Sequence, residues 1–259
     1  MELPDGLLIV DYEETRRKIV KFIWEYFDKA GVSCVVMGLS GGIDSSLVAT
    51  LACEALGGEK VKALLLPVDA KKDAENVRDA SDLAETLGMS YELFEIGPAV
   101  EAYEPLSLGK VALGNLMARL RMAAWYGVAN NRNGLVLGTG NRSEILIGYF
   151  TKYGDGGVDI LPIAELYKMN VWGLARHVGV PNHICEKVPS AGLWANQTDE
   201  GEIGVSYQEL DSILYLRFDI GMEPDAIVSA GYSRENVNRV LGLVSGSQHK
   251  RNPPPKATI

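Results

Sequence analysis

The sequence predicts an α/β protein, folded as a single domain over residues 1–259, with a doubly wound parallel sheet flanked by helices. Short apolar runs alternate with segments of helical periodicity through the first half of the chain. Strands that alternate with helices of this length form right-handed βαβ units, which give a parallel sheet. The length suits one large α/β domain, and no linker-like stretch divides it.

The elements of the first half follow from apolar spacing. Residues 12–30 have an amphipathic helical pattern, and residues 34–39 form a buried apolar run that we expect to be the first strand. A helix is expected at 46–56. The elements that follow are a strand at 61–68, a helix at 74–87, a strand at 90–96, a helix at 110–131 and a strand at 135–137.

After residue 150 the pattern changes to loops and helices. Residues 151–159 are Gly-rich, and 189–204 are irregular. Helices are predicted at 165–178, 206–218 and 234–246. We therefore expect the sheet in the first half of the chain and mainly helical structure in the second.

Composition narrows the class of protein. A net charge of −9 argues against general binding to nucleic acid or to an anionic membrane surface. No apolar run approaches the length of a membrane span, and the N-terminus lacks the pattern of a signal peptide. Cys34, Cys53 and Cys185 are widely spaced, so neither a disulfide framework nor a structural zinc site is expected. We expect a cytoplasmic protein.

The most informative segment is Gly-Leu-Ser-Gly-Gly-Ile-Asp-Ser-Ser at 38–46, between a buried strand and a helix. Such a turn presents unpaired backbone N–H groups at the positive end of the helix dipole, which favours phosphate binding. Asp44 within the turn indicates that a cation also binds there, because a carboxylate alone would repel a polyphosphate.

Two other interpretations of this turn remain open. It lacks the Lys of the common mononucleotide loop. It does match G-x-S-x-G, the strand–turn–helix of a hydrolase nucleophile elbow, but His177, His183 and His249 are poorly placed along the chain to serve as its base. The turn is also compatible with a simple connection that binds nothing.

Two later segments add candidate ligand-binding groups. Arg119 and Arg121 lie two apart on a predicted helix and cannot share a face, so one can point into a site while the other makes a structural contact. Glu144 follows the Gly-rich end of the last predicted strand, where it can join Asp44 on Mg²⁺ or simply stabilise the start of a helix.

A third segment combines three glycines with Lys152, Asp155 and Asp159 within 151–159. Loops that grip a ligand often have this composition, although a solvated surface turn would also explain it.

Residues 40–45 match the SGGxDS signature of the ATP pyrophosphatases, which cleave ATP between its α and β phosphates. Within that group the chain resembles the NAD synthetases over about residues 15 to 255. The similar blocks are at 114–122, 138–144, 151–157, 166–168 and 249–251. The resemblance implies the adenine nucleotide alpha hydrolase-like fold. The block at 151–157 and the basic residues at 249–251 are more specific for the NAD synthetases than the SGGxDS signature is.

The resemblance implies a two-step reaction that completes NAD biosynthesis. The nicotinate carboxylate of deamido-NAD attacks the α-phosphorus of ATP, and ammonia then displaces AMP from the adenylated acid. Such a reaction needs groups that stabilise the departing pyrophosphate, for which N–H donors and Mg²⁺ are suited. Another ATP pyrophosphatase acting on a different acid, and a nucleotide-binding module without turnover, are the alternatives.

The resemblance also assigns roles to individual positions of this chain. The residues that would bind ATP are Gly38, Leu39, Ser40, Gly41, Gly42, Ile43, Asp44, Ser45, Ser46, Thr139, Lys168 and Ser190. Those that would bind deamido-NAD are Arg119, Lys152, Asp159, His249 and Lys250, with Asp155 orienting the nicotinate end. Asp44 and Glu144 would hold Mg²⁺, and Asp44, Lys168 and Ser190 would act in catalysis.

Three positions depart from the family pattern. Met117 stands where a Lys is frequent, Ser190 replaces the more usual Thr, and Gly192 follows where an Asp is common. The substitution at Ser190 keeps the hydroxyl, so its role is carried over. Nothing is carried over at Gly192.

The resemblance finally implies partners. We expect a homodimer with the deamido-NAD site near the subunit boundary. Trp24, Phe27, Trp125 and Tyr126 are candidates for that contact, although core packing explains them equally well. No glutaminase domain is expected in the chain, so the ammonia would be free or delivered by another protein.

Overall fold

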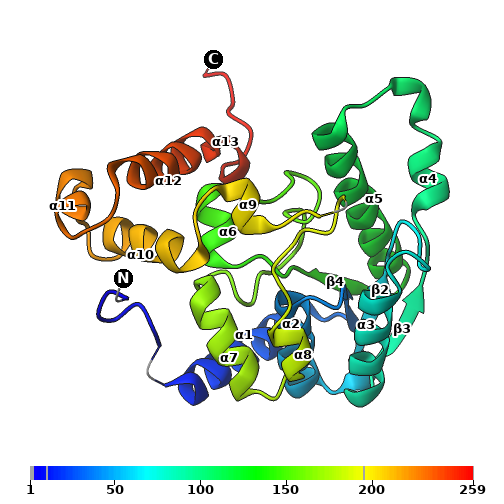
Figure 1. Ribbon diagram of the computed structural model, residues 1–259. Coiled ribbons are helices and arrows are strands. Elements are labelled where there is room, and N and C mark those ends of the chain that lie inside the picture. The colour runs from blue at the N-terminus through cyan, green and yellow to red at the C-terminus, as the bar shows by residue number, and fades with distance from the viewer. Residues whose placement is uncertain (1–2, 10, 195, 259) are drawn as a thin grey trace.

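The computed structural model describes residues 3–9, 11–194 and 196–258, and its centre is a four-stranded parallel sheet of order β3-β2-β1-β4 (Figure 1). The strands are β1 (Cys34–Gly38), β2 (Val61–Leu65), β3 (Ser90–Leu93) and β4 (Gly134–Leu137). Val36 of β1 pairs with Lys62 on one side and with Val136 on the other. The order reverses at β1, because the chain first adds β2 and β3 on one side and then places β4 on the other.

Helices cover both faces of this sheet, as the prediction of a doubly wound fold requires. Val35 and Met37 of β1 belong to a core built with α1 (Tyr12–Ala30), α2 (Ile43–Leu56), α3 (Ala74–Thr86) and α7 (Lys168–His177). Val36 points to the opposite face and packs in a second core with α5 (Lys110–Asn131). Successive strand residues alternate between faces, so one buried apolar run serves both cores.

The second half of the chain forms a third core of helices beside the sheet (Figure 1). Its helices are α6 (Arg142–Ile147), α9 (Asp199–Ile203), α10 (Tyr207–Phe218), α11 (Pro224–Ser229) and α12 (Arg234–Gly246). Trp172 of α7 packs against both this core and the core on the α1–α2 face of the sheet. The remaining short helices are α4 (Gly97–Glu101), α8 (Asn182–Cys185), α13 (Gln248–Arg251), and the 3₁₀ turns η1 (Gly58–Lys60) and η2 (Glu104–Leu106).

The structure corrects several boundaries. The helix expected at 46–56 begins at Ile43, because Gly42 in an extended conformation is already its N-cap, and this places Asp44 in the first turn. The helix expected at 165–178 begins at Lys168 and ends at His177. The strand expected at 61–68 ends at Leu65, and the strand expected at 90–96 ends at Leu93. Beyond Leu93, the amides of Phe94 and Ile96 still donate hydrogen bonds to the backbone at the end of β2.

Among the described residues, no helix combines the length and the apolar character needed to cross a membrane.

Candidate functional site

A cavity of about 520 Å³ lies at the carboxyl ends of β1, β2 and β4. The glycine-rich turn after β1 and the Thr139–Gly140 turn after β4 both line it, and the segment from Lys187 to Trp194 lines another wall. The point where strand order reverses is where open α/β sheets bind ligands, because the loops there diverge to opposite faces. The fold therefore brings the two predicted glycine turns to one site.

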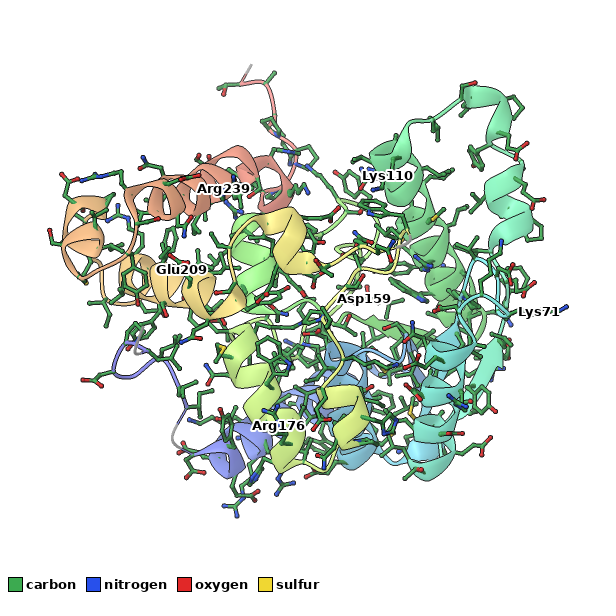
Figure 2. The ribbon with its side chains drawn as sticks, viewed as in Figure 1. Lys71, Lys110, Asp159, Arg176, Glu209 and Arg239 are labelled. Carbon is green, nitrogen blue, oxygen red and sulfur yellow. The ribbon has the colours of Figure 1, made fainter. Side chains whose placement is uncertain are left out.

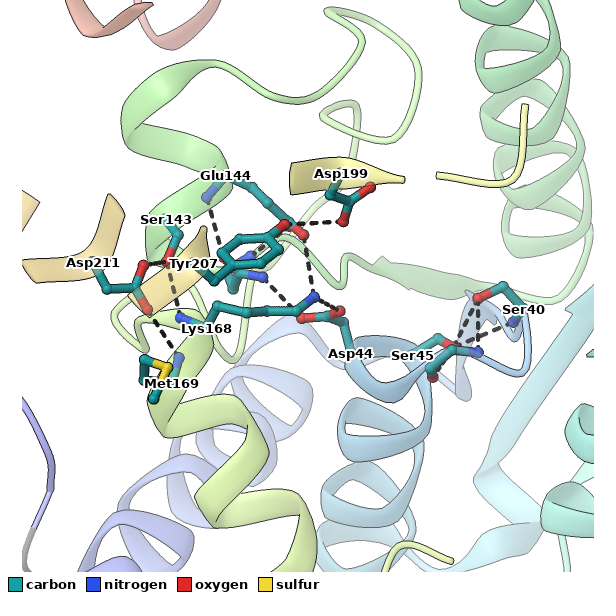
Figure 3. A network of polar contacts seen from close by, with 12 residues as sticks. Ser40, Asp44, Ser45, Ser143, Glu144, Lys168, Met169, Asp199, Tyr207 and Asp211 are labelled. Carbon is teal, nitrogen blue, oxygen red and sulfur yellow. Dashed lines mark hydrogen bonds and ion pairs between the residues drawn. The ribbon is translucent and has the colours of Figure 1, made fainter. Parts of the chain in front are cut away.

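The turn after β1 is held open by its own side chains. Ser40 Oγ lies 3.1 Å from Ser45 Oγ, and the Gly42 amide donates to Ser40 Oγ at 3.3 Å (Figure 3). Gly41 has φ of +74°, and a Cβ there would come within 2.5 Å of the Asn76 carbonyl oxygen. No side chain caps α2, so the N–H groups of its first turn are left for a ligand, and an anion suits them best.

The nucleophile-elbow alternative is not supported by the surroundings of Ser40. Its hydroxyl contacts Ser45 and the loop backbone. His177 instead contacts Glu13, and His183 contacts Asp79. None of the hydrogen bonds described for Ser40 is with a histidine.

A buried charge cluster forms one wall of the cavity. Lys168 is 1% exposed, and its Nζ lies 2.5 Å from Asp44 Oδ2 and 3.6 Å from Glu144 Oε1 (Figure 3). Asn141 Nδ2 donates to Asp44 Oδ1 at 2.9 Å, and the Asn141 amide donates to Glu144 Oε2 at 3.2 Å. The strand ends of β1 and β4 thus bring Asp44 and Glu144 to the same ammonium group.

The pKa values of this cluster follow from its burial. Burial and then the Asp44 charge raise the pKa of Glu144 to about 8, although Lys168 opposes this shift. Burial alone would lower the pKa of Lys168, but Asp44 and Glu144 outweigh it and raise that pKa above its usual value. Lys168 is therefore a fixed cation in a wall with an excess of carboxylates.

The position of Lys168 is set by a further carboxylate, Asp211, which is fully buried. Asp211 of α10 accepts hydrogen bonds from Ser143 Oγ and from the Met169 amide, the latter at 2.9 Å (Figure 3). Ser143 Oγ in turn accepts from the Lys168 amide at 2.9 Å. Since Tyr167 supplies no side-chain cap, Asp211 and Ser143 satisfy the first amides of α7 from outside the helix. Burial raises the pKa of Asp211 to about 7.

Asp199 is a further acid of the cavity that sequence reasoning missed. It is 4% exposed, lines the cavity and accepts from Tyr207 Oη at 2.9 Å (Figure 3). Burial raises its pKa. The Tyr207 ring centroid lies 5.2 Å from Lys168 Nζ, so the same tyrosine contacts both charges. Asp199 lies in the stretch 189–204, whose irregular pattern gave no signal for it.

Most of the residues that the resemblance assigns to ATP meet at this cavity. Those that line it are Gly38, Leu39, Ser40, Gly42, Ile43, Asp44, Ser45, Thr139, Lys168 and Ser190. Gly41 contributes its backbone to the same turn, whereas Ser46 is fully buried behind it. Glu144, the second predicted metal ligand, also lines the cavity.

The residues assigned to deamido-NAD divide into two groups. Lys250 lines the cavity and donates to the carbonyls of Gly148 and Phe150, each at 2.7 Å. Asp155 also lines it and accepts from the Thr151 amide at 2.9 Å. Burial raises the pKa of Asp155.

The other residues assigned to deamido-NAD do not line the cavity; they are Arg119, Lys152, Asp159 and His249. Arg119 is exposed and donates to the Lys152 carbonyl at 3.3 Å, and Lys152 Nζ donates to the His249 carbonyl at 2.6 Å. Asp159, labelled in Figure 2, accepts from Tyr126 Oη at 2.9 Å and from the β4 backbone.

Of the two arginines of α5, Arg121 is the one that lies at the cavity. Arg121 lines the cavity and donates from Nε to the Leu66 carbonyl at 3.0 Å. Burial lowers its pKa, and Asp73 and Asp155 oppose that shift. Spacing left open which of the pair faces a site and the resemblance assigned Arg119, whereas the structure places Arg121 at the cavity.

Asp44 and Glu144 have the donor chemistry that suits Mg²⁺. The described residues contain no group of three or more His, Cys, Asp or Glu side chains arranged to hold a metal. Mg²⁺ is usually held by one or two carboxylates together with substrate phosphates and water, so two partly buried carboxylates beside a phosphate-binding turn fit it.

The chain matches the family model described as NAD synthase over residues 15–254. It belongs to the NAD synthase family. An NH(3)-dependent NAD(+) synthetase from Methanosarcina acetivorans is 45% identical over 252 residues, which cover 95% of this chain and 98% of that protein.

Two solved structures of the NAD synthase fold are similar to this chain. An NMN synthetase from Francisella tularensis superposes with a TM-score of 0.84 at 36% identity, covering 97% of this chain and 100% of that one. An NH3-dependent NAD synthetase from Campylobacter jejuni has a TM-score of 0.83 at 30% identity, with 96% and 100% coverage.

Proposed function

We propose that this protein amidates deamido-NAD with ammonia, uses ATP with Mg²⁺, and releases AMP and pyrophosphate. The observation that carries this proposal is the convergence of a phosphate-binding turn with the Lys168–Asp44–Glu144 cluster in one cavity, in a chain that the NAD synthase model matches over residues 15–254. The reaction is inferred from membership of the family, and the cavity contains side chains that suit this reaction.

The ATP side of the cavity is suited to holding a leaving pyrophosphate. The first-turn amides of α2 would bind its oxygens, and Thr139 and Ser190, which also line the cavity, would donate hydroxyls. Lys168 places a cation where negative charge develops, which lowers the barrier without moving any group. Asp44 and Glu144 would hold Mg²⁺, which would neutralise the phosphate oxygens.

The substrate carboxylate is itself the nucleophile, so the chain needs no covalent catalyst. Its task is to hold two reactants in line and to stabilise charge. Asp155, Arg121 and Lys250 also line the cavity, where they can orient the nicotinate end of the acid.

We further propose a cytoplasmic homodimer in which a second copy completes the deamido-NAD site. Arg119, Lys152 and His249 lie together outside the cavity of their own chain, which supports a role at a boundary. Trp24 is 52% exposed, so core packing does not account for it. Phe27, Trp125 and Tyr126 do pack against the cores and carry less weight.

A second candidate function is the amidation of nicotinate mononucleotide to nicotinamide mononucleotide. The similarity to a structure named as an NMN synthetase, at 36% identity over nearly the whole chain, favours it. The two acids share the reacting nicotinate and its ribose phosphate, so the ATP side of the cavity would act identically on both.

A product assay distinguishes these functions. The purified protein is incubated with ATP, Mg²⁺ and ammonium, with deamido-NAD or nicotinate mononucleotide as the acid, and all products are quantified by chromatography. We expect NAD, AMP and pyrophosphate in equal amounts, with kcat/KM for deamido-NAD at least about tenfold above that for the mononucleotide, equivalent to about 1.4 kcal/mol. The reverse preference would favour the second candidate, and ADP with phosphate would contradict both.

A further inference from the structure

Lys187 contacts three residues from two separate segments at the edge of the cavity. Its Nζ donates to Asn76 Oδ1 at 2.7 Å and to the Gly41 carbonyl at 3.3 Å, and it forms an ion pair with Asp79. Asn76 and Asp79 both belong to α3, whereas Gly41 is the centre of the glycine-rich turn. One ammonium group therefore ties this turn to α3 and to the segment that leads to Ser190.

The peptide unit between Gly41 and Gly42 is held at both ends. Its carbonyl accepts from Lys187, and its N–H donates to Ser40 Oγ at 3.3 Å. A peptide between two glycines rotates easily about its flanking bonds, because neither residue has a Cβ that would clash. Rotation would turn the carbonyl oxygen to the Ser40 side of the turn, where its partial negative charge would oppose phosphate.

We propose that Lys187 is a positioning residue for ATP, which fixes the orientation of the Gly41–Gly42 peptide in the phosphate-binding turn. The inference rests on the proposed use of ATP. Asn76 accepts from the ammonium and fixes it beside the Gly41 carbonyl, whereas Asp79, which is 6% exposed, supplies only its counter-charge. Lys187 acts through the turn and has no part in the chemical step.

A purely structural role for Lys187 would be to neutralise the buried Asp79 carboxylate. Breaking a buried ion pair is strongly destabilising because the remaining charge is uncompensated, so Lys187→Met alone would mix both effects. The variant Asp79→Asn removes the charge that needs a partner. The double variant Lys187→Met, Asp79→Asn therefore loses the contact with Gly41 without leaving an unpaired acid.

The experiment compares this double variant with Asp79→Asn alone and with Lys71→Met, a matched loss of an exposed lysine that points away from the molecule (Figure 2). Dissociation constants for ATP with Mg²⁺ and for deamido-NAD are measured by calorimetry, and KM and kcat by pyrophosphate release. We expect the double variant to bind ATP about tenfold or more weakly, as loss of a charged hydrogen bond to the turn implies. Its affinity for deamido-NAD and its kcat at saturating ATP should stay within about threefold.

The controls decide between the two roles of Lys187. Asp79→Asn and Lys71→Met should bind ATP with the affinity of the wild type. The melting temperature of the double variant should be close to that of Asp79→Asn. Wild-type affinity for ATP in the double variant would overturn the inference, as would an equal loss in Asp79→Asn. A wild-type protein that binds ATP but forms no amide would contradict the proposed function alone, whereas one that binds no ATP would contradict both.

Discussion

Replacement of Lys168 by methionine is expected to lower kcat by about a thousandfold, the cost of removing one preorganised donor from a charged transition state. Lys168 is the buried cation that contacts Asp44 and Glu144 at the cavity wall. Methionine keeps much of the side-chain volume but removes the charge. The measurement is pyrophosphate release at saturating ATP, deamido-NAD and ammonium.

The control for Lys168→Met is Lys18→Met, which removes an exposed lysine that pairs with Glu14 of the same helix. It should leave kcat unchanged. The loss of Lys168 also removes the charge that opposes the raised pKa of Glu144, so burial and Asp44 would then raise that pKa further. An activity within tenfold of the wild type in Lys168→Met would show that the cation does not contribute to the chemical step.

Asp211→Ala is expected to lower the free energy of unfolding by about 3 kcal/mol, because two donors lose their shared acceptor at once. These donors are the Ser143 hydroxyl and the Met169 amide, and Asp211 itself is fully buried. Asp211→Asn keeps one acceptor oxygen and should lose roughly half as much. Urea unfolding monitored by circular dichroism measures both values.

The pH dependence of stability tests the same carboxyl group. Its pKa is about 7 in the folded protein and 3.8 in a model compound, so the folded state binds a proton that the unfolded state releases. The contribution to stability is therefore complete below pH 4 and is lost as the pH rises through 7. Asp211→Asn should make the unfolding free energy flatter than that of the wild type between pH 5 and 8. Parallel curves would show that Asp211 does not titrate in this range.

Most of the site could be predicted because it is built at strand ends. Asp44 and Glu144 each follow a predicted strand, and parallel strands bring their carboxyl ends to one edge. Lys168 and Ser190 were predicted from the family resemblance alone, because no local sequence pattern indicates a functional role for them. Apolar spacing found the long helices well, because α1 and α5 extend over several turns.

The groups that sequence reasoning missed lie where the pattern is weakest. Lys187 lies just before the irregular stretch 189–204, and Asp199 lies within it. The helix α9, which carries Asp199, is five residues long. A helix this short has no repeated apolar face from which to predict it. The choice between Arg119 and Arg121 depended on how α5 packs against the sheet, and helical spacing alone does not contain that information.

The position of β1 in the middle of the sheet has a consequence for synthesis on the ribosome. Val36 acquires its second neighbour only when Val136 has been translated, and until then one long edge of the nascent sheet stays unpaired. The apolar edge of β1 is therefore open to aggregation while α5 is still being synthesised. Slow codons or bound chaperones between β3 and β4 would be expected to influence its yield more than the same changes near the carboxyl end.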